Sequence, residues 1–258
     1  MKSWFWQKNK MTPCSGVPLN DRGFRYGQHL FETIAIRNGK VLFFEEHWMR
    51  LIAAAERHRF PVDAFWHQGV HDFLKRESWE DGVLRIFLTA GEGLPLSPIT
   101  KPQLFLFWEE ADFPSEEKFK KGIKVVSLDQ PIGTISWGEK TGNYWEHLNA
   151  LESARQAGAE EGLVFDREDF LISAAMANVI LWLEDGGIVT PPRSRGARDG
   201  VMLDQVRQCF PKLMETDMRR DDLKKVVAMV VTNSRLGVMP VAMLDGRKLS
   251  HLSFPIIF

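Results

Sequence analysis

A polar, charged stretch, Glu109–Lys121, divides this 258-residue chain into two halves that both alternate strand-like and helix-like patterns. Alternation of this kind predicts a mixed α/β or α+β fold, and the dividing stretch predicts two domains. We place a small N-terminal α/β domain at residues 1–112, a linker at 113–121 and a larger C-terminal domain at 122–258. The chain is long enough for each domain to bury a core.

In the first half, the clearest local signal is Asn38-Gly39, which stands between two apolar runs and predicts a two-residue β-hairpin. Glu45–Phe60 then carries apolar residues at helical spacing, and Pro61 ends that helix. Asp63 is placed to cap a second helix that runs to about Lys75. Strands are expected at Thr33–Ile36, Lys40–Phe44, Val83–Thr89 and Leu104–Trp108.

In the second half, the longest predicted helix spans about Tyr144–Ala157 and ends at Gly158. A shorter helix is expected at Gly200–Phe210, with Asp199 as its N-cap. Strands are expected at Ile123–Leu128, Leu163–Phe165, Ile180–Trp182, Val226–Val231 and Val238–Met243.

Composition excludes several classes of protein. The formal net charge is −1, so the chain lacks the basic character expected of a nucleic-acid binder. Cys14 and Cys209 are too few for a disulfide framework or a zinc cluster, which favours a reducing cytoplasm. Neither the start of the sequence nor any later run has the apolar length of a signal peptide or a membrane span. We therefore expect a soluble protein with no membrane partner.

One pair of histidines has the spacing of a metal site. His67 and His71 are four residues apart on a predicted helix, as on a two-histidine metal face. The neighbouring Asp72 and Glu77 have the character of ordinary surface charges, and nothing close in the sequence supplies a third ligand. We therefore expect no metal site.

Six segments, in order along the chain, resemble the fold-type IV pyridoxal-phosphate enzymes. That family includes branched-chain aminotransferases, D-amino-acid aminotransferases and 4-amino-4-deoxychorismate lyase. Each segment alone is weakly diagnostic, but their order and spacing agree from about Pro18 to Lys248. The matching segments are Asp21–Gly27 with Leu30–Thr33, Glu46–Leu51, Lys140–Tyr144 with the helix after it, Asn178, Thr190–Val201 and Thr232–Val241.

The resemblance implies a D-amino-acid aminotransferase-like fold, with pyridoxal 5'-phosphate in the cleft between the domains and bound by the C-terminal one. It implies that Lys140 bonds covalently to the cofactor and moves the α-proton of the substrate, which requires a neutral amine. Arg50 would hold the cofactor phosphate with its planar fork of donors, and a salt bridge to Glu46 is the structural alternative. The other cofactor-binding residues implied are Ser173, Asn178, Ser234 and, at the start of a helix, Gly200, Val201 and Met202.

The resemblance also indicates where a substrate binds. Tyr26 and Glu32 take positions that line the mouth of the active site in this family, and Arg25 and Arg235 are candidates to contact an anionic substrate. Apolar walls would come from Trp137 and Tyr144. We expect a small amino or chorismate-derived substrate and, as in the family, a homodimer.

Ser173 departs from the family pattern, in which a glutamate at this position bonds the pyridine nitrogen of the cofactor and keeps it protonated. A neutral pyridine is a weaker electron sink, which favours elimination over transamination. We therefore expect an enzyme similar to 4-amino-4-deoxychorismate lyase, which releases pyruvate and p-aminobenzoate. The alternatives are a D-amino-acid or branched-chain aminotransferase, and a cofactor-binding homologue that has lost turnover.

Overall fold

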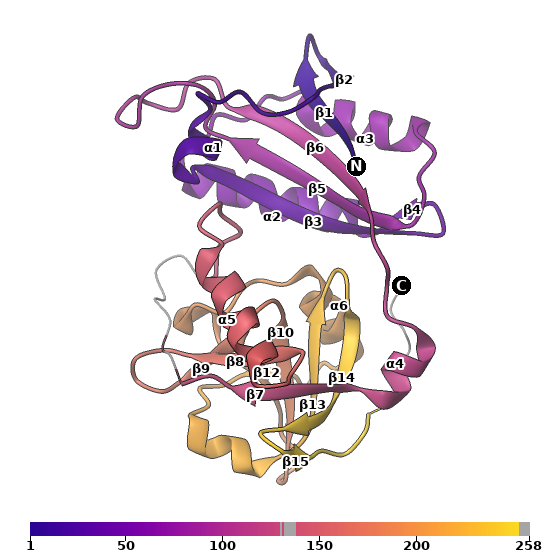
Figure 1. Cartoon of the computed structure of the whole chain (residues 1–258), viewed down its shortest axis with the longest axis vertical. Coiled ribbons are helices and arrows are strands. Elements are labelled where there is room, and N and C mark those ends of the chain that lie inside the picture. Colours follow the sequence, from indigo (N-terminus) through magenta and orange to yellow (C-terminus); the bar gives the residue numbers. More distant parts are fainter. Residues whose placement is uncertain (130, 132–137, 253–258) are drawn as a thin grey trace. The chain divides into compact units, whose positions relative to one another are not determined.

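The structure is a computed structural model that describes residues 1–129, 131 and 138–252. The chain divides into two compact units (Figure 1). The first comprises Met1–Asp112 and the short segment Lys140–Asn143, and the second comprises Phe113–Glu139 and Tyr144–Phe258. The chain therefore returns to the first unit at Lys140 and leaves it again after Asn143.

The first unit is an antiparallel sheet with two helices on one face (Figure 1). Its strands lie in the order β2-β1-β6-β5-β3-β4, and neighbouring strands are antiparallel. The covering helices are α2 (Phe44–Arg57) and α3 (Trp66–Arg76), and a short helix, α1 (Arg22–Tyr26), precedes β3. The strands are β1 (Lys2–Gln7), β2 (Lys10–Pro13), β3 (His29–Arg37), β4 (Lys40–Val41), β5 (Gly82–Thr89) and β6 (Gln103–Glu110).

A hydrophobic core joins this sheet to both helices. Ile34, Ile86 and Leu106 come from three adjacent strands, and each is fully buried. They belong to one cluster with Trp48 of α2 and Val70 of α3. Because side chains alternate between the faces of a strand, these residues leave their sequence neighbours on the opposite face.

The predicted hairpin at Asn38-Gly39 is confirmed. These two residues have φ angles of 50° and 73°, and they connect β3 to β4. The structure also contains an N-terminal hairpin, β1–β2, that the sequence did not predict. Its turn, Lys8-Asn9, likewise has two positive φ angles, but it lacks the glycine that made the second hairpin recognisable.

The second unit is built on a curled sheet of nine strands in the order β12-β11-β10-β13-β14-β7-β8-β9, with β15 paired to β14. Helix α6 (Val201–Cys209) packs on this sheet through Leu203 and Val206, and α5 (Trp145–Gln156) packs on β8. The strands are β7 (Ile123–Ser127), β8 (Glu161–Phe165), β9 (Leu171–Ala174), β10 (Asn178–Leu183), β11 (Ile188–Thr190), β12 (Met214–Glu215), β13 (Val226–Asn233), β14 (Gly237–Leu244) and β15 (Arg247–Lys248). Two 3-10 helices, η1 (Arg193–Arg195) and η2 (Arg220–Lys225), lie between strands.

The stretch predicted as a linker contains a helix. Helix α4 (Glu116–Lys121) is capped by Ser115, whose hydroxyl accepts a hydrogen bond from the amide of Lys118. It packs against β14 and belongs to the second unit, which begins at Phe113. A charged helix with no buried residue has the composition of a linker, so the sequence pattern did not separate the two.

Two predicted helix caps differ from the observed ones. Helix α3 begins after Phe65 rather than Asp63, although the Asp63 carboxylate accepts a hydrogen bond from the Phe65 amide at 2.9 Å. Helix α6 has Gly200, not Asp199, at its N-cap position. None of the helices described is long and apolar enough to cross a membrane.

Candidate active site

Lys140 lies on the short segment that returns to the first unit. The Phe31 amide donates to the carbonyl of Lys140 at 2.9 Å, and the Gly142 amide donates to the carbonyl of His29 at 2.9 Å. The segment therefore runs along the start of β3. Asn143 lies close to Gly27, where a Cβ atom would be 2.9 Å from the Asn143 side-chain oxygen and where φ is +67°. A glycine is thus required for this close approach.

The side chain of Lys140 packs against an aromatic ring. Its Nζ atom is 4.2 Å from the centre of the Phe31 ring and donates to Thr33 Oγ1 at 3.4 Å. Phe31 and Thr33 point away from the α2 side of the sheet, because Leu30 and Ile34 belong to the core there. The amine is half-buried beside an apolar surface, which is the environment that a lysine nucleophile needs.

A buried ionic cluster lies on the other face of β3. The Glu32 carboxylate accepts hydrogen bonds from Arg50 Nε at 2.7 Å, from Arg50 Nη2 at 2.6 Å and from His47 Nδ1 at 2.8 Å. Glu32 is only 1% exposed. Burial opposes its ionisation, but the charge and hydrogen bonds of Arg50, with those of His47, hold its pKa well below the usual range. Burial lowers the pKa of His47, and the charges of Arg50 and Lys140 add to that lowering.

This cluster changes the interpretation of Glu32. The resemblance placed Glu32 at the mouth of the active site, whereas its carboxylate lies inside the unit and orients the guanidinium fork of Arg50. The predicted structural alternative for Arg50 was a salt bridge to Glu46, and the structure shows an ion pair between Arg50 and Glu32. Glu32 is therefore a residue that positions Arg50.

Tyr26 and Arg25 lie at the surface of the first unit, at the end of α1. Tyr26 is 43% exposed, and the Arg25 guanidinium lies 4.9 Å from the centre of its ring. The helix is held by Asp21, whose buried carboxylate accepts from the Gly23 amide at 2.7 Å and from Thr89 Oγ1 at 2.6 Å. The side chains of Tyr26 and Arg25 therefore extend from a short helix that Asp21 holds in place.

In the second unit, four of the predicted cofactor residues, Asn178, Gly200, Val201 and Met202, lie at the N-terminus of α6. Val201 and Met202 are buried in its first turn. The side chain of Asn178 donates to the carbonyl of Arg198 at 2.7 Å, just before the helix. A Cβ atom at Gly200 would collide with the side-chain oxygen of Asn178, so only glycine fits there. The chain is therefore fixed where amide groups at the helix end favour an anion.

Thr232 is a residue of this region that the sequence did not single out. It pairs with Asn178 across β10 and β13, next to the Ile180–Val230 pair that packs under α6. Its hydroxyl is fully buried and has no hydrogen-bond partner among the residues that the structure describes. A buried hydroxyl of this kind is costly unless a bound group satisfies it.

Ser234 and Arg235 follow Thr232 in the turn between β13 and β14. The Asn233 side-chain oxygen accepts from the amides of Arg235 and Leu236 at 2.9 and 2.8 Å, which fixes the turn. Ser234 is half-buried and Arg235 is exposed. The hydroxyls of Thr232 and Ser234 and the amides at the start of α6 are of the chemical type that binds a phosphate.

Ser173 is buried in β9. Its hydroxyl donates to the carbonyl of Ala174 at 2.8 Å, and the residue pairs with Val164 of β8. The position that carries a glutamate in the resembling family therefore holds a neutral side chain.

A stack of three polar side chains, Arg198, His147 and Tyr144, lies near these residues in the second unit. His147 Nε2 is 3.1 Å from Arg198 Nη2, and the Tyr144 ring lies on the His147 ring with centres 4.3 Å apart. The sequence did not predict this stack, although both Tyr144 and Arg198 fall inside the matching segments. Tyr144 was expected only as an apolar wall, and Trp137, expected beside it, lies outside the described residues.

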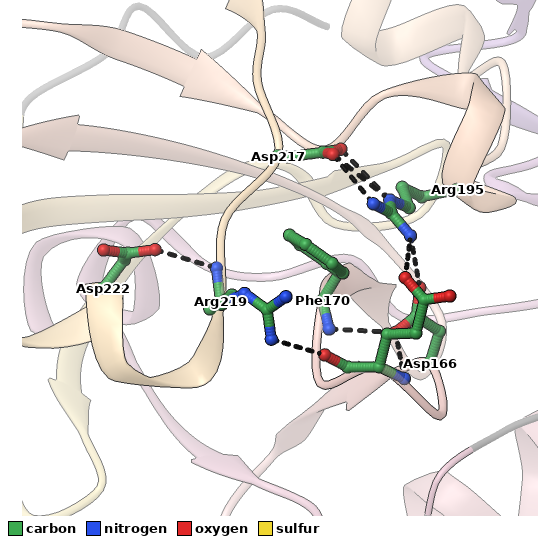
Figure 2. A network of polar contacts seen from close by, with 7 residues as sticks. Asp166, Phe170, Arg195, Asp217, Arg219 and Asp222 are labelled. Atoms are coloured by element: carbon green, nitrogen blue, oxygen red, sulfur yellow. Dashed lines mark hydrogen bonds and ion pairs between the residues drawn. The ribbon is translucent and has the colours of Figure 1, made fainter.

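An ionic network anchors the loop that precedes α6 (Figure 2). Arg195 of η1 donates to Asp217 at 3.0 Å and to Glu168 at 3.0 Å. Its guanidinium lies 3.7 Å from the centre of the Phe170 ring, and that of Arg219 lies 4.1 Å from the same centre (Figure 2). Because η1 leads directly to Gly196–Gly200, this network fixes the start of the loop that leads to α6.

The histidine pair of α3 has an acidic neighbour on α2. His67 Nε2 is 2.8 Å from one oxygen of Glu45, and His71 Nε2 is 4.0 Å from the other. These side chains are partly exposed, His71 least at 29%, and make ordinary surface contacts. Within the described residues, no group of three or more His, Cys, Asp and Glu side chains is arranged to hold a metal ion.

Comparison with known proteins gives a consistent result. The family model described as amino-transferase class IV matches residues 29–244. The chain is 24% identical to a putative branched-chain-amino-acid aminotransferase of Methanocaldococcus jannaschii, over 91% of this chain and 85% of that protein. It is 23% identical to the aminodeoxychorismate lyase of Vibrio harveyi, over 98% of this chain and 95% of that protein. The solved structure of 4-amino-4-deoxychorismate lyase from Pseudomonas aeruginosa is similar with a TM-score of 0.84 and 26% identity, covering 97% of this chain and 94% of that chain.

Proposed function

Because the chain belongs to the class IV aminotransferase family, whose enzymes use pyridoxal 5'-phosphate, we propose that it catalyses an elimination on this cofactor. The proposed reaction is that of 4-amino-4-deoxychorismate lyase, which releases pyruvate and p-aminobenzoate. Several similar proteins are named as aminodeoxychorismate lyases, one of them as putative.

The chain supplies the groups that this chemistry needs. The bound cofactor would act as the electron sink for the bond being broken. Lys140 would hold the cofactor and, once displaced by the amino substrate, take the α-proton at Nζ. Arg50, Thr232 and Ser234 would hold the phosphate, with the amides at the start of α6. Asn178 would support that helix end through its bond to the carbonyl of Arg198.

The observation that carries the choice of elimination is Ser173. Its neutral, buried hydroxyl stands where the resembling enzymes carry a carboxylate. Ser173 would offer the ring nitrogen of a bound cofactor no negative charge to hold its proton, and each pKa unit lost would correspond to about 1.4 kcal/mol. Amino transfer depends on a strong electron sink at two successive carbons, so it suffers more than a single elimination.

Two other functions remain as alternatives. A D-amino-acid or branched-chain aminotransferase would share the same lysine and phosphate groups, and several similar proteins are named as such enzymes. A homologue that binds the cofactor without turnover would also be compatible with Ser173. For each of the three functions, we propose that the protein is a homodimer in the cytoplasm. Size-exclusion chromatography with light scattering tests the oligomeric state.

The test compares products. Purified enzyme with pyridoxal 5'-phosphate is incubated with 4-amino-4-deoxychorismate, and p-aminobenzoate and pyruvate are measured. Equal release of both products, without any 2-oxo acid added, supports the lyase. Transfer of the amino group of D-alanine or leucine to 2-oxoglutarate, with no p-aminobenzoate, would show an aminotransferase. Cofactor binding with neither activity would leave the third alternative.

A further inference from the structure

We propose that Glu161 is a positioning residue for the phosphate of the cofactor. Through the turn between β9 and β10, it fixes the end of β13 and the turn after it, where Thr232 and Ser234 lie. This inference rests on the proposed function, because it requires the phosphate of pyridoxal 5'-phosphate at these two hydroxyls. Glu161 was not singled out from the sequence.

Glu161 carries a buried carboxyl group that has a specific partner. It is the first residue of β8 and is only 3% exposed. Its Oε2 atom accepts a hydrogen bond from the Met176 amide at 3.2 Å, and the amides of Gly162 and Ala175 also face the carboxyl group. Burying a carboxyl group costs free energy unless its oxygens are hydrogen-bonded, so these amides are what allows Glu161 to lie inside the unit.

The turn that Glu161 contacts joins β9 to β10. The Ala175 amide donates to the carbonyl of Gly162 at 2.8 Å, and the next amide, that of Met176, donates to the Glu161 side chain. Two successive amides of the turn are therefore bonded to two successive residues of β8. Of these two bonds, the one to Glu161 is made by a side chain, so a substitution can remove it without altering the backbone.

Asn233 connects this turn to the turn that follows β13. Its side-chain nitrogen donates to the carbonyl of Met176 at 3.1 Å. Its side-chain oxygen accepts from the amides of Arg235 and Leu236 at 2.9 and 2.8 Å. A carbonyl can only accept and an amide can only donate, so all three bonds agree on one orientation of the Asn233 side chain. The side chain is thus held at one end by the β9–β10 turn, and its other end holds the turn that contains Ser234.

Asn233 lies between the two residues whose hydroxyls would bind the phosphate. Thr232, on one side, pairs with Asn178 of β10, whose side chain donates to the carbonyl of Arg198 just before α6. Ser234, on the other side, lies inside the turn that Asn233 fixes. Hydrogen bonds weaken steeply when distance or angle departs from the optimum, so a displaced strand end would lose its bonds to the phosphate. Glu161 therefore acts on the phosphate through backbone position and does not touch it.

The experiment compares pyridoxal 5'-phosphate with pyridoxal, which lacks the phosphate. Dissociation constants of both ligands are measured by equilibrium dialysis on the whole chain stripped of cofactor. Glu161→Leu removes the acceptor and should weaken binding of pyridoxal 5'-phosphate about tenfold, while binding of pyridoxal changes less than about twofold. Glu161→Gln keeps an accepting oxygen and should stay within about twofold of the wild type for both ligands. Glu160→Leu is the matched control, because Glu160 is exposed and accepts from the Lys124 amide rather than from the turn. It should alter neither affinity.

A second variant tests whether the effect travels through Asn233. In Asn233→Ser the hydroxyl can still accept within its own turn, but it is too short to reach the carbonyl of Met176. We expect the same selective loss of affinity for the phosphorylated ligand. Because both residues belong to one hydrogen-bonded chain, the double variant Glu161→Leu/Asn233→Ser should be within about twofold of the weaker single variant. Losses that multiply would show that the two residues act independently, which would overturn the inference.

Circular dichroism and thermal unfolding confirm that each variant is folded. If Glu161→Leu does not fold, Glu161→Thr takes its place, because threonine suits a strand and its hydroxyl is too short to reach the Met176 amide. Equal weakening of both ligands in the folded Glu161 variant, or no weakening, would overturn the inference while the proposed function stands. If the unaltered protein binds neither ligand, the proposed function fails and this inference with it.

Discussion

The guanidinium of Arg50 donates hydrogen bonds to both oxygens of the Glu32 carboxylate, with Nε 2.7 Å from Oε1 and Nη2 2.6 Å from Oε2. The pair joins α2 to β3 inside the first unit, and His47 adds a third hydrogen bond to the same carboxylate. Lys140 lies along the edge of β3. The orientation of Arg50 and the position of Lys140 therefore both depend on this strand.

Removal of the charge at Glu32 should destabilise the first unit. Glu32→Gln leaves the Arg50 guanidinium without its buried counter-charge, which typically costs about 3–5 kcal/mol of unfolding free energy. Glu109→Gln is the control, since Glu109 pairs with Arg85 at the surface, where the loss should be below about 1 kcal/mol. Urea unfolding of both variants at neutral pH measures the difference, and equal stabilities would contradict it.

The same pair predicts an acid dependence. The pKa of Glu32 in the folded protein lies below its ordinary value of 4.5, so its stabilisation is present above pH 4.5. It is lost progressively as the pH falls below that value. The gap in stability between the wild type and Glu32→Gln should therefore narrow from pH about 5 to pH about 3. A gap that stays constant over this range would show that the ion pair is not its source.

Glu161 should produce the opposite dependence. It is buried in β8, where its carboxylate accepts from the Met176 amide at 3.2 Å, and burial raises its pKa from 4.5 to about 7. The folded protein keeps a proton that the unfolded chain releases, so stability from this group is full below pH 4.5 and is lost as the pH rises through about 7. That loss amounts to about 3 kcal/mol.

Glu161→Gln imitates the protonated form and should remove this slope. The unfolding free energy of Glu161→Gln should change less than that of the wild type between pH about 5 and 8. At pH 8 the variant should be more stable than the wild type. Urea unfolding at several pH values in this window measures both slopes. Parallel curves for the two proteins would mean that Glu161 is already ionised in the folded state.

Gly200→Ala tests whether the close packing of Gly200 against Asn178 supports cofactor binding. Gly200→Ala places a methyl group against the side chain of Asn178, which must then release the carbonyl of Arg198. We expect at least tenfold weaker binding of pyridoxal 5'-phosphate, because a misplaced helix end loses charge-assisted hydrogen bonds. Gly16→Ala, at a position with open space, is the control. Equal affinities in the two variants would contradict the role assigned to this helix end.

We expect Ser173 to influence whether elimination or amino transfer is favoured. Ser173→Glu restores a carboxylate and should raise the ratio of amino transfer to p-aminobenzoate release by about tenfold or more, equivalent to one pKa unit at the pyridine nitrogen. Ser173→Gln is the matched control, because glutamine has nearly the same size as glutamate but carries no charge. If both variants give one ratio, the missing carboxylate does not control the reaction. Absence of both activities in Ser173→Glu would show that a further defect exists.

Local patterns predicted much of the fold. The hairpin at Asn38-Gly39 and the helix that became α2 follow from a turn dipeptide and an apolar period, which act within a few residues. The hairpin β1–β2 and helix α4 were missed because their local composition is ambiguous. For β1–β2 the turn lacks glycine, and α4 buries no residue.

The site was predicted through resemblance more than through local pattern. Motif order identified Lys140 and Arg50, but the partner of Arg50 is Glu32, eighteen residues earlier on a neighbouring strand. The hydrogen bond between His147 and Arg198 joins residues 51 positions apart, so no local periodicity predicts it. The orphan hydroxyl of Thr232 became visible only when the strand pairing placed it beside Asn178.

Lys140 is the lysine that we expect to bond to pyridoxal 5'-phosphate. The protein is loaded with the cofactor, its visible absorption band is recorded, and borohydride then fixes the bound cofactor for peptide mass spectrometry. We predict a band and a single modified peptide that contains Lys140, both absent from a folded Lys140→Ala variant. No band and no label in folded wild-type protein, or a label on another lysine that persists in Lys140→Ala, would contradict this role of Lys140.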